Sequence, residues 1–398
     1  MNDICMQHRP RILLFVSHYL PGYKAGGPLR TISNMVEQLG HEFDFWIVTR
    51  DRDQGDVGAY ENIAVDQWVT VNNAHVYYCS PKQQCLSALI AVINETPHDI
   101  LYLNSVFDRS FTIKPLVARF LGKLSHKPTL LAPRGEFSQG ALKLKRRKKR
   151  VYLLVSKFMG LYKNITWHAS SEHEMKDIQR IFPKALPDIL IALDLPAEIG
   201  FSAMDVKHPT AEDYSTGELR IVFLSRISPM KNLDFALHVL SIVKSNIIFD
   251  IYGPLEDPHY WEKCQKLIAT LPSNVAVTYR GIVIPDDVSA TFFAYDLFLF
   301  PTHGENYGHV IAESLRVGTP VLLSDKTPWR DLSDDGLGWD ISLDDTEKFV
   351  EIIESCASKN QETRTRDRVH IQEKIIERLT ESAVLEANRQ LFYKRTSK

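Results

Sequence analysis

Cysteine is scarce in this chain of 398 residues, and its placement excludes two common uses of the thiol. No two cysteines form a CxxC pair, and none shows the cysteine–histidine spacing of a zinc site. We therefore expect free thiols in a reducing compartment. The five cysteines are Cys5, Cys79, Cys85, Cys264 and Cys356.

A long apolar segment is also missing at the start of the chain. The first nine residues are mostly polar and contain no signal-peptide core. The first apolar run, residues 11–16, is far too short to cross a bilayer. A net charge of −2 argues against a general nucleic-acid binder. We expect a cytoplasmic protein without a nucleic-acid partner, in which any basic function is local.

What the sequence does contain is an alternation of short apolar runs with longer helical segments. Hydrophobic residues make up 44% of the chain, and its length favours two domains. Near-continuous apolar strands between helices predict parallel sheets covered on both faces, so each half is expected to be a doubly wound, Rossmann-like α/β domain. The expected strands are residues 11–17, 43–49, 75–78, 100–103, 129–132, 165–168 and 189–191, then 219–224, 247–252, 275–279, 297–301, 320–323 and 338–341.

The boundary between the halves is predicted from composition. Residues 196–217 mix proline, glycine and charged residues without periodicity. We therefore assign a first domain to residues 1–198, a linker to 199–217, a second domain to 218–380 and a terminal helix to 381–398. Ligands of such sheets bind beyond the carboxyl ends of the strands, so a cleft between the facing domains is the expected site.

Three segments follow expected strands and contain groups suited to a phosphorylated sugar. After the first strand, Gly26 and Gly27 would let backbone N–H groups approach an anion, although the segment is not GxGxxG. An ordinary glycine turn is the alternative. After strand 219–224, Arg226 and Lys231 are placed to neutralise a diphosphate. Two solvated surface cations are the alternative there.

The third segment is the most informative. Residues 304–308 read Gly-Glu-Asn-Tyr-Gly between a buried strand and a helix, and Glu313 lies eight residues after Glu305. A helix N-terminus suits phosphate, and carboxylates suit sugar hydroxyls. The alternatives are an acid at a helix dipole and a surface acid. The order of the three segments favours a nucleotide-sugar site.

With these motifs the chain resembles the retaining, nucleotide-sugar-dependent glycosyltransferases of the GT-B type, the large family 4 class found in bacterial polysaccharide synthesis. The resemblance covers nearly the whole chain. It depends on Gly26-Gly27, Arg226, Lys231-Asn232, Tyr252-Gly253-Pro254, Gly281, and residues 305–313 with the following Gly318-Thr319-Pro320-Val321.

The resemblance implies roles for these residues. Arg226 and Lys231 would bind the donor diphosphate and stabilise the leaving group, Glu305 would bind sugar hydroxyls, and Glu313 would bind the ribose. The last helix would pack back toward the first domain. Further donor contacts are implied for the backbone of Asn306, Tyr307 and Gly308, for Gly253, for Gly281 and Ile282 beside the base, and for Gly26 and Gly27 at the phosphates.

One departure from the family concerns the acceptor. Where many relatives have histidine near the ends of the fourth and fifth strands, this chain has Asn104 and Arg134. Arginine cannot act as a base, so we predict a substrate-binding role for Arg134, with nearby Glu136 as a carboxylate. In such enzymes the departing phosphate oxygen is thought to take the acceptor proton.

No metal or other cofactor is expected, because cations and helix termini would neutralise the leaving group. Residues 51–53 form an Asp-x-Asp triplet in a loop, which we interpret as a turn, with a metal role as the alternative.

Residues 143–150 form a basic stretch, in which seven of the eight side chains are cationic. Apolar residues follow at near-helical spacing, a pattern that attracts anionic membrane surfaces. A solvated helix face and a buried packing helix are the alternatives.

We therefore predict transfer of a hexosyl group, with UDP-glucose or a related UDP-hexose as donor, to a saccharide or lipid-linked acceptor in exopolysaccharide or cell-surface glycan synthesis. The enzyme would be cytoplasmic, and peripheral association with the inner face of a membrane is a further expectation. A nucleotide-sugar epimerase and a non-catalytic sugar-nucleotide-binding scaffold are the alternatives.

Overall fold

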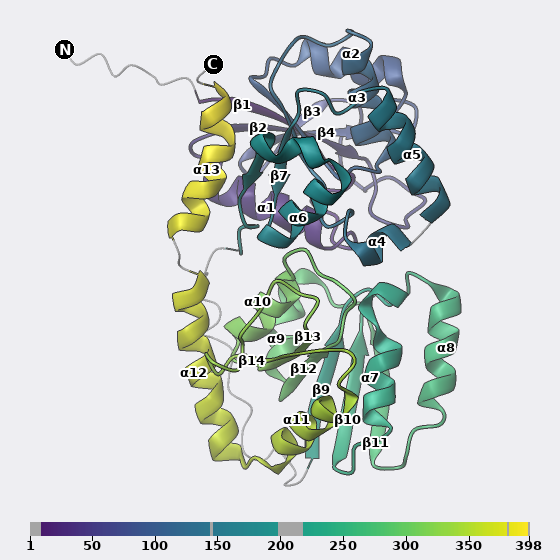
Figure 1. Ribbon diagram of the computed structural model, residues 1–398, viewed down its shortest axis with the longest axis vertical. Coiled ribbons are helices and arrows are strands. Elements are labelled where there is room, and N and C mark those ends of the chain that lie inside the picture. Colours follow the sequence, from purple (N-terminus) through teal and green to yellow (C-terminus); the bar gives the residue numbers. More distant parts are fainter. Residues whose placement is uncertain (1–8, 144–145, 198–217, 380–381, 397–398) are drawn as a thin grey trace, which may run out of the picture. The chain divides into compact units, whose positions relative to one another are not determined.

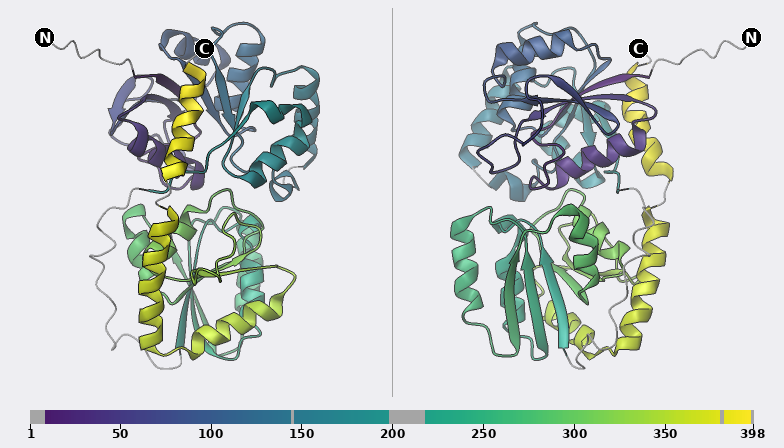
Figure 2. Two further views of the ribbon diagram at one scale, coloured as in Figure 1. Left: turned by 60° about the vertical axis from the view of Figure 1, so that its left-hand side comes forward. Right: turned by 180° about the vertical axis from the view of Figure 1, so that it is seen from behind.

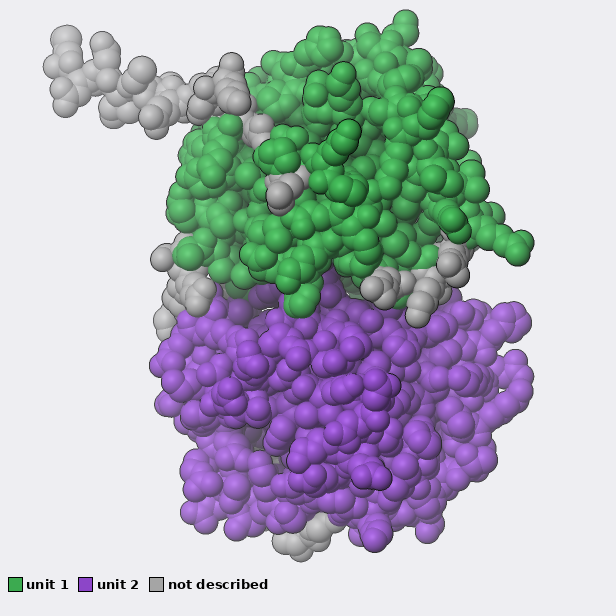
Figure 3. Space-filling view, viewed as in Figure 1, with its two compact units in different colours: residues 1–198, 382–398 green, residues 199–381 purple. Residues whose placement is uncertain are grey.

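The computed structural model describes residues 9–143, 146–197, 218–379 and 382–396, which form two compact units (Figure 3). Unit 1 is Met1–Glu198 together with Ser382–Lys398, and unit 2 is Ile199–Glu381. The predicted linker, residues 199–217, lies outside the described residues. No helix in the described ranges is long and apolar enough to cross a membrane.

Unit 1 is built on an eight-stranded sheet in the order β3-β4-β2-β1-β5-β6-β7-β8 (Figure 1). Every neighbouring pair is parallel except β3 and β4. The strands are β1 (Arg11–Phe15), β2 (Asp44–Arg50), β3 (Trp68–Val71), β4 (Ala74–Cys79), β5 (Ile100–Asn104), β6 (Thr129–Ala132), β7 (Thr166–Ala169) and β8 (Ile189–Ile191).

Helices cover both faces of this sheet because successive residues of each strand point to opposite sides and nearly all are apolar. On one face, β1 contributes Ile12 and Leu14 to a core shared with α1; on the other, Leu13 and Phe15 pack under α2 and α3. The helices of residues 27–181 are α1 (Gly27–Leu39), α2 (Leu86–Glu95), α3 (Lys114–Phe120), α4 (Gln139–Lys143), α5 (Arg146–Phe158) and α6 (Glu172–Ile181).

The end of the chain completes the first of these cores. Helix α13 (Ser382–Thr396) brings Leu391 and Phe392 into the cluster around Phe43 and Phe45. The rings of Phe43 and Phe392 lie 5.0 Å apart, centroid to centroid. Figure 2 shows α13, in yellow, against the sheet of unit 1 in both views. A segment that follows unit 2 in sequence is therefore part of unit 1.

Unit 2 contains a fully parallel six-stranded sheet in the order β11-β10-β9-β12-β13-β14. One continuous core fills the space between its strands and helices. Its strands are β9 (Glu218–Leu224), β10 (Asn246–Tyr252), β11 (Val275–Gly281), β12 (Leu297–Phe300), β13 (Val321–Ser324) and β14 (Gly338–Ile341), and its helices are α7 (Leu233–Leu240), α8 (Pro258–Ile268), α9 (Val288–Phe293), α10 (His309–Arg316), α11 (Thr346–Ser358) and α12 (Gln361–Leu379).

The α/β class with two parallel-sheet domains is confirmed, and one strand escaped prediction. Strand β3 pairs antiparallel with β4 through a tight turn at Asn72 and Asn73, and Asn72 has a φ of 49°. Two asparagines between two short runs rich in valine are a hairpin signal. Three of the four β3 residues are half-buried and one is exposed, as is usual for a strand at the edge of a sheet.

In both sheets the order in which strands are added reverses at the first strand of the unit: the chain first adds strands on one side of it and then on the other. We call this place the reversal point. In unit 1 this happens between β1 and β5, and in unit 2 between β9 and β12. Loops at such a point diverge and leave room for a ligand at the carboxyl ends of the strands. The loops after β9 and β12 contain the predicted cations and the predicted carboxylate of the donor site.

Candidate functional site

The predicted donor residues of unit 2 lie in loops at the carboxyl ends of four adjacent strands. Along the order β11-β10-β9-β12 these loops contain Ile282, Gly253, Arg226 and Glu305. Four adjacent strands cover about 14 Å at the usual spacing. Their order matches the predicted order of contacts, from base to diphosphate to sugar.

Lys231 and Glu305 form an ion pair at the reversal point between β9 and β12. The Lys231 ammonium donates a hydrogen bond to Oε1 of Glu305, and the two side chains are only 11% and 14% exposed. The same ammonium lies 5.3 Å from the ring centroid of Phe300, the last residue of β12. An ammonium has three N–H donors, so pairing with one carboxylate leaves capacity for an anion.

Backbone contacts hold the two loops together around this pair. The N–H of His303 and the hydroxyl of Thr302 both donate to the carbonyl of Met230, over 2.9 and 3.0 Å. The side-chain amide of Asn232 donates to the carbonyl of Pro301 over 2.9 Å. The position of Lys231 relative to Glu305 therefore depends on several bonds besides the ion pair.

The loop after β13 supports the turn at residues 305–308. The sequence did not predict a role for this loop. The indole N–H of Trp329 donates to the carbonyl of Tyr307 over 2.6 Å, and the N–H of Glu305 donates to the carbonyl of Lys326 over 3.3 Å. Trp329 is only 4% exposed. β13 neighbours β12, so its following loop could have been identified from strand order alone.

Gly308 begins helix α10 in a left-handed conformation with φ 83° and ψ 59°. L side chains rarely adopt this φ, so the turn favours glycine here. The first N–H groups of a helix have no acceptor within the helix, and here they follow Asn306 and Tyr307 directly. Glu313 lies half-buried farther along α10.

Arg226 is in the predicted loop and is directed toward a different carboxylate. Its guanidinium forms a 2.8 Å ion pair with Glu256 of the loop after β10, and the side chains are 35% and 36% exposed. The structure thus joins Lys231 to Glu305. Arg226 lies in the same loop as Lys231, without a direct contact to that pair among the described interactions.

The loops after β10 and β11 contact each other through glycine. The N–H of Gly253 donates to the carbonyl of Gly281 over 2.7 Å. A Cβ on Gly253 would lie 1.8 Å from the carbonyl oxygen of Ser225, so the loops after β9 and β10 pack at backbone distance there. Ile282 is 45% exposed at the end of β11, a position suited to stacking against a base.

In unit 1, Gly26 and Gly27 form the start of α1. Gly26 is the N-cap, with φ 76°, and the space beside Gly27 is open. The loop therefore exposes backbone where an anion could approach, as the prediction requires.

Arg134 has contacts different from those the sequence led us to expect. Its guanidinium donates to Asp194 over 2.5 Å, to Oδ1 of Asn104 over 3.0 Å and to the hydroxyl of Tyr102 over 2.8 Å. The side chain is 2% exposed. These contacts stabilise the interior of unit 1 and do not support the substrate-binding role predicted for Arg134.

The carboxylate of Glu136 also has its hydrogen-bond partners within unit 1. It accepts hydrogen bonds from the Ser105 hydroxyl and from the N–H groups of Val106 and Phe107. Burial raises the pKa of this carboxyl despite these donors. It therefore orders the loop after β5.

A polar cluster lies at the reversal point of unit 1. Asp108 accepts hydrogen bonds from the Ser17 hydroxyl over 2.5 Å and from Arg50 over 2.9 Å. Burial alone would raise the pKa of Asp108, but Arg50 and backbone N–H groups hold it below its usual value. His18 is beside them, and burial lowers its pKa, with Arg50 acting in the same direction. The cluster lies at the carboxyl ends of β1, β2 and β5.

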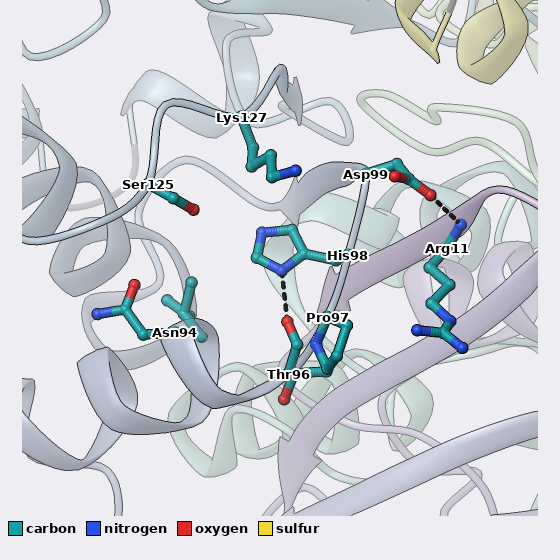
Figure 4. Close-up of a pocket in the computed structure, with 9 residues that line it drawn as sticks. Arg11, Asn94, Thr96, Pro97, His98, Asp99, Ser125 and Lys127 are labelled. Atoms are coloured by element: carbon teal, nitrogen blue, oxygen red, sulfur yellow. Dashed lines mark hydrogen bonds between the residues drawn. The ribbon is translucent and has the colours of Figure 1, made fainter.

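A hollow of about 270 Å³ in unit 1 lies at the opposite edge of the sheet (Figure 4). It is lined by residues that precede β5 and β6, including His98, Asp99 and Lys127, and by Arg11 at the start of β1. His98 Nδ1 lies 2.7 Å from the carbonyl oxygen of Thr96. Because ligands of doubly wound sheets bind at the carboxyl edge, this hollow is not the predicted site.

Within the described ranges, no three His, Cys, Asp or Glu side chains come together as a set of metal ligands. The Asp-x-Asp triplet has local partners instead. Asp51 pairs with Arg52, and Asp53 accepts hydrogen bonds from the N–H groups of Tyr23 and Lys24. Whether the reaction needs a metal stays a prediction.

Comparison with known proteins agrees with this fold. A curated protein of Klebsiella pneumoniae, described as an uncharacterized 41.2 kDa protein in the cps region, is 25% identical over 279 residues, which are 68% of this chain and 74% of that protein. Sucrose-phosphate synthase from Thermosynechococcus elongatus superposes with a TM-score of 0.73 at 15% identity, covering 97% of this chain and 99% of the other. HepE from Anabaena, solved with UDP and glucose, superposes with a TM-score of 0.68 at 16% identity, covering 98% and 100%.

The family model described as "Glycosyl transferases group 1" matches residues 207–373, which include the loops after β9, β10, β11, β12 and β13. The two parallel-sheet domains have the architecture of GT-B glycosyltransferases. Residues 207–373 therefore match the group 1 glycosyltransferases, in a chain with the GT-B fold.

Proposed function

We propose that the chain transfers a hexosyl group from a UDP-linked sugar to a hydroxyl of a saccharide or lipid-linked saccharide in glycan synthesis, with retention of the anomeric configuration. The observation that carries this proposal is the Lys231–Glu305 pair at the reversal point of the unit 2 sheet. It provides a cation for the diphosphate directly beside a carboxylate for the sugar.

The donor would extend across the four loops at this edge. Its base would contact Ile282, its diphosphate Arg226 and Lys231, and its hexose Glu305 and the backbone of residues 306–308. Glu313 would accept hydrogen bonds from the ribose. HepE, which has the same fold, has been solved with UDP-glucose, and this supports a UDP-hexose as the first donor to test.

The mechanism assigned to these residues is electrostatic. As the glycosidic bond to the diphosphate breaks, negative charge grows on the leaving oxygen, and the fixed cations Lys231 and Arg226 stabilise it. Glu305 keeps Lys231 in place before the reaction and binds hexose hydroxyls during it. The departing phosphate oxygen accepts the proton of the acceptor hydroxyl, so a separate protein base is unnecessary.

The decisive experiment is turnover of labelled UDP-glucose with and without a panel of saccharide and lipid-linked acceptors. Glucosylated product that forms only when acceptor is present supports transfer, and the anomeric configuration of the new linkage tests retention. Conversion of UDP-glucose into an isomer without acceptor would instead show an epimerase. Saturable binding with no product for any acceptor would leave a binding scaffold as the function.

A further inference from the structure

Helix α5 of unit 1 has an apolar face that its own unit does not cover. Val151, Leu154, Val155 and Phe158 are 61%, 60%, 51% and 94% exposed. Their spacing of three and four residues puts all four on one side of the helix. We call these four residues the α5 stripe. Single exposed apolar residues are ordinary, but a continuous stripe indicates a surface that binds something.

The opposite side of α5 already packs within unit 1. Leu153 and Ser156 are 8% and 2% exposed, and the hydroxyls of Tyr152 and Tyr162 are 2.7 Å apart. The helix is therefore anchored without using the stripe. This excludes a buried packing helix, which was one of the alternatives for this segment.

Cationic side chains extend the same face toward the start of the helix. Arg147 and Lys148 precede Val151 by four and three residues, so they lie one turn before the stripe on the same side. Both are exposed, as is Arg150. No ion pair of these three appears among the described residues. From residue 146 to residue 158 the helix contains no acidic residue.

Two other lysines of α5 have partners within unit 1. Lys149 donates to the carbonyl of Ala141 over 2.8 Å and lies 4.7 Å from the ring centroid of Phe107. Lys157 lies 5.1 Å from the ring centroid of Phe182. Three of the four exposed cations described on α5, Arg147, Lys148 and Arg150, are thus at the start of the helix, and the fourth, Lys157, lies over an aromatic ring.

Two more exposed apolar side chains lie on unit 1 at the end of α3. Arg119, at the end of α3, donates hydrogen bonds to the carbonyls of Lys163 and Asn164, just beyond α5. The next two residues, Phe120 and Leu121, are 48% and 53% exposed. Figure 1 shows α3 and α5 next to each other on unit 1. The end of α3 therefore carries exposed apolar side chains and is bonded to the segment that follows α5.

We propose that the exposed face of α5 is a docking surface for an anionic lipid bilayer, with Arg147 and Lys148 at the headgroups and the α5 stripe inserted among the upper acyl chains. Charge selects this occupant. A helix face with three exposed cations and no acid fits a surface that is both negatively charged and apolar beneath, whereas a second copy would present the same cations again. The site would hold the enzyme beside a lipid-linked acceptor, but it does not depend on the proposed reaction.

Flotation with vesicles tests the proposal. The full chain should float with vesicles of phosphatidylcholine mixed with phosphatidylglycerol and stay behind with phosphatidylcholine alone. Leu154→Ser with Phe158→Ser should weaken binding about tenfold or more, because the apolar insertion is lost. Arg147→Ser with Lys148→Ser should weaken it roughly 30-fold at low salt and reduce its salt dependence.

Matched controls separate the stripe from general surface effects. Val57→Ser changes an apolar residue of unit 1 that is 90% exposed and lies outside α5. Lys82→Ser with Lys244→Ser removes two exposed cations elsewhere. Both control variants should bind vesicles as wild type does, and all variants should keep their affinity for UDP, so failure of the donor site would be recognised separately.

Three results would overturn the proposal. They are absence of vesicle binding, equal binding to neutral and anionic vesicles, and an unchanged affinity in both α5 variants. Sedimentation velocity tests whether a second copy of the chain binds the α5 stripe instead. If wild type dimerises and Phe158→Ser abolishes the dimer without affecting vesicle binding, the stripe is an interface between copies of the chain.

Discussion

At the scale of single residues, Lys231 combines two properties that rarely occur together. Its ammonium is largely buried, yet it remains beside a loop edge at which a ligand can arrive. Burial of a cation is tolerated when a carboxylate is in contact, and Glu305 fulfils that condition in the free protein. A diphosphate would therefore meet a cation that is already oriented, and little side-chain entropy would be lost on binding.

Replacement of Lys231 is the most direct test of this site. Lys231→Ala should weaken UDP binding about 10- to 100-fold, because a charged hydrogen bond to phosphate is lost. Isothermal titration with UDP measures this. Lys263→Ala is the matched control, since Lys263 is an exposed lysine of the same unit that pairs with Asp234. Wild-type affinity in Lys231→Ala would remove the residue from the donor site.

Arg134 gives a second residue-scale prediction, about stability. Arg134→Met should lower the free energy of unfolding of unit 1 by about 3–5 kcal/mol, because Asp194 would remain buried without its cation. Urea unfolding measures this, and adding Asp194→Leu should restore part of the loss. Wild-type stability with turnover abolished would instead return Arg134 to a substrate-binding role.

His168 should make unit 1 sensitive to acid. Burial, reinforced by Arg134, lowers the pKa of His168 to about 3 from its usual 6.5. The neutral ring is built into the structure, with Nε2 donating to the carbonyl of Ala192 over 2.8 Å and Nδ1 accepting from the Tyr102 hydroxyl over 2.5 Å. Between pH 6.5 and 3 the unfolded chain therefore binds a proton that the folded chain does not.

The stability that His168 contributes is fully present above pH 6.5 and is lost as the pH falls toward 3. The expected slope is about 1.4 kcal/mol per pH unit within this window. Urea unfolding of wild type and His168→Gln at several pH values isolates this slope, because the other histidines are common to both. Parallel pH profiles for the two proteins would contradict the assignment.

At the scale of elements, the sequence predicted strands, because a buried strand has an apolar run. It did not predict contacts between side chains that lie far apart along the chain. The strands of unit 2 were predictable because their apolar runs pack on both faces. The buried state of Arg134 was not, because Asp194 lies 60 residues further along the chain. The Lys231–Glu305 pair, 74 residues apart, was within reach only because both follow strands whose order the resemblance implies.

Loop packing gives a prediction at this scale. Gly253→Ala should destabilise unit 2 by roughly 2 kcal/mol more than Gly281→Ala. Both glycines have positive φ, but only Gly253 would place its new methyl 1.8 Å from the Ser225 carbonyl oxygen, while Gly281 has open space. Chemical unfolding of the two variants makes the comparison. Equal losses would mean that φ alone sets the cost, and that the loops after β9 and β10 can separate freely.

At the scale of the whole molecule, the chain returns to its first unit after completing its second. Helix α12 ends at Leu379 in the core of unit 2, and α13 begins at Ser382 in unit 1. Hydrophobic periodicity could predict both helices but not the unit on which each of them packs. Helix α13 packs on unit 1 because Phe392 covers aromatic side chains there. No local sequence pattern indicates this contact.

Removing that contact should therefore affect a unit far away in sequence. Phe392 packs on Phe43, Phe45 and Tyr102, with centroid distances of 5.0, 5.9 and 5.9 Å, and Phe392→Ala should lower the stability of unit 1 by about 3–5 kcal/mol. Hydrogen exchange should quicken in β2 and β5 and stay unchanged in β9 and β12, with UDP affinity retained. Lys394→Ala, at an exposed position on the same helix, should change neither. Faster exchange confined to unit 2 would show that α13 stabilises the second unit, and that its packing on Phe43 contributes little.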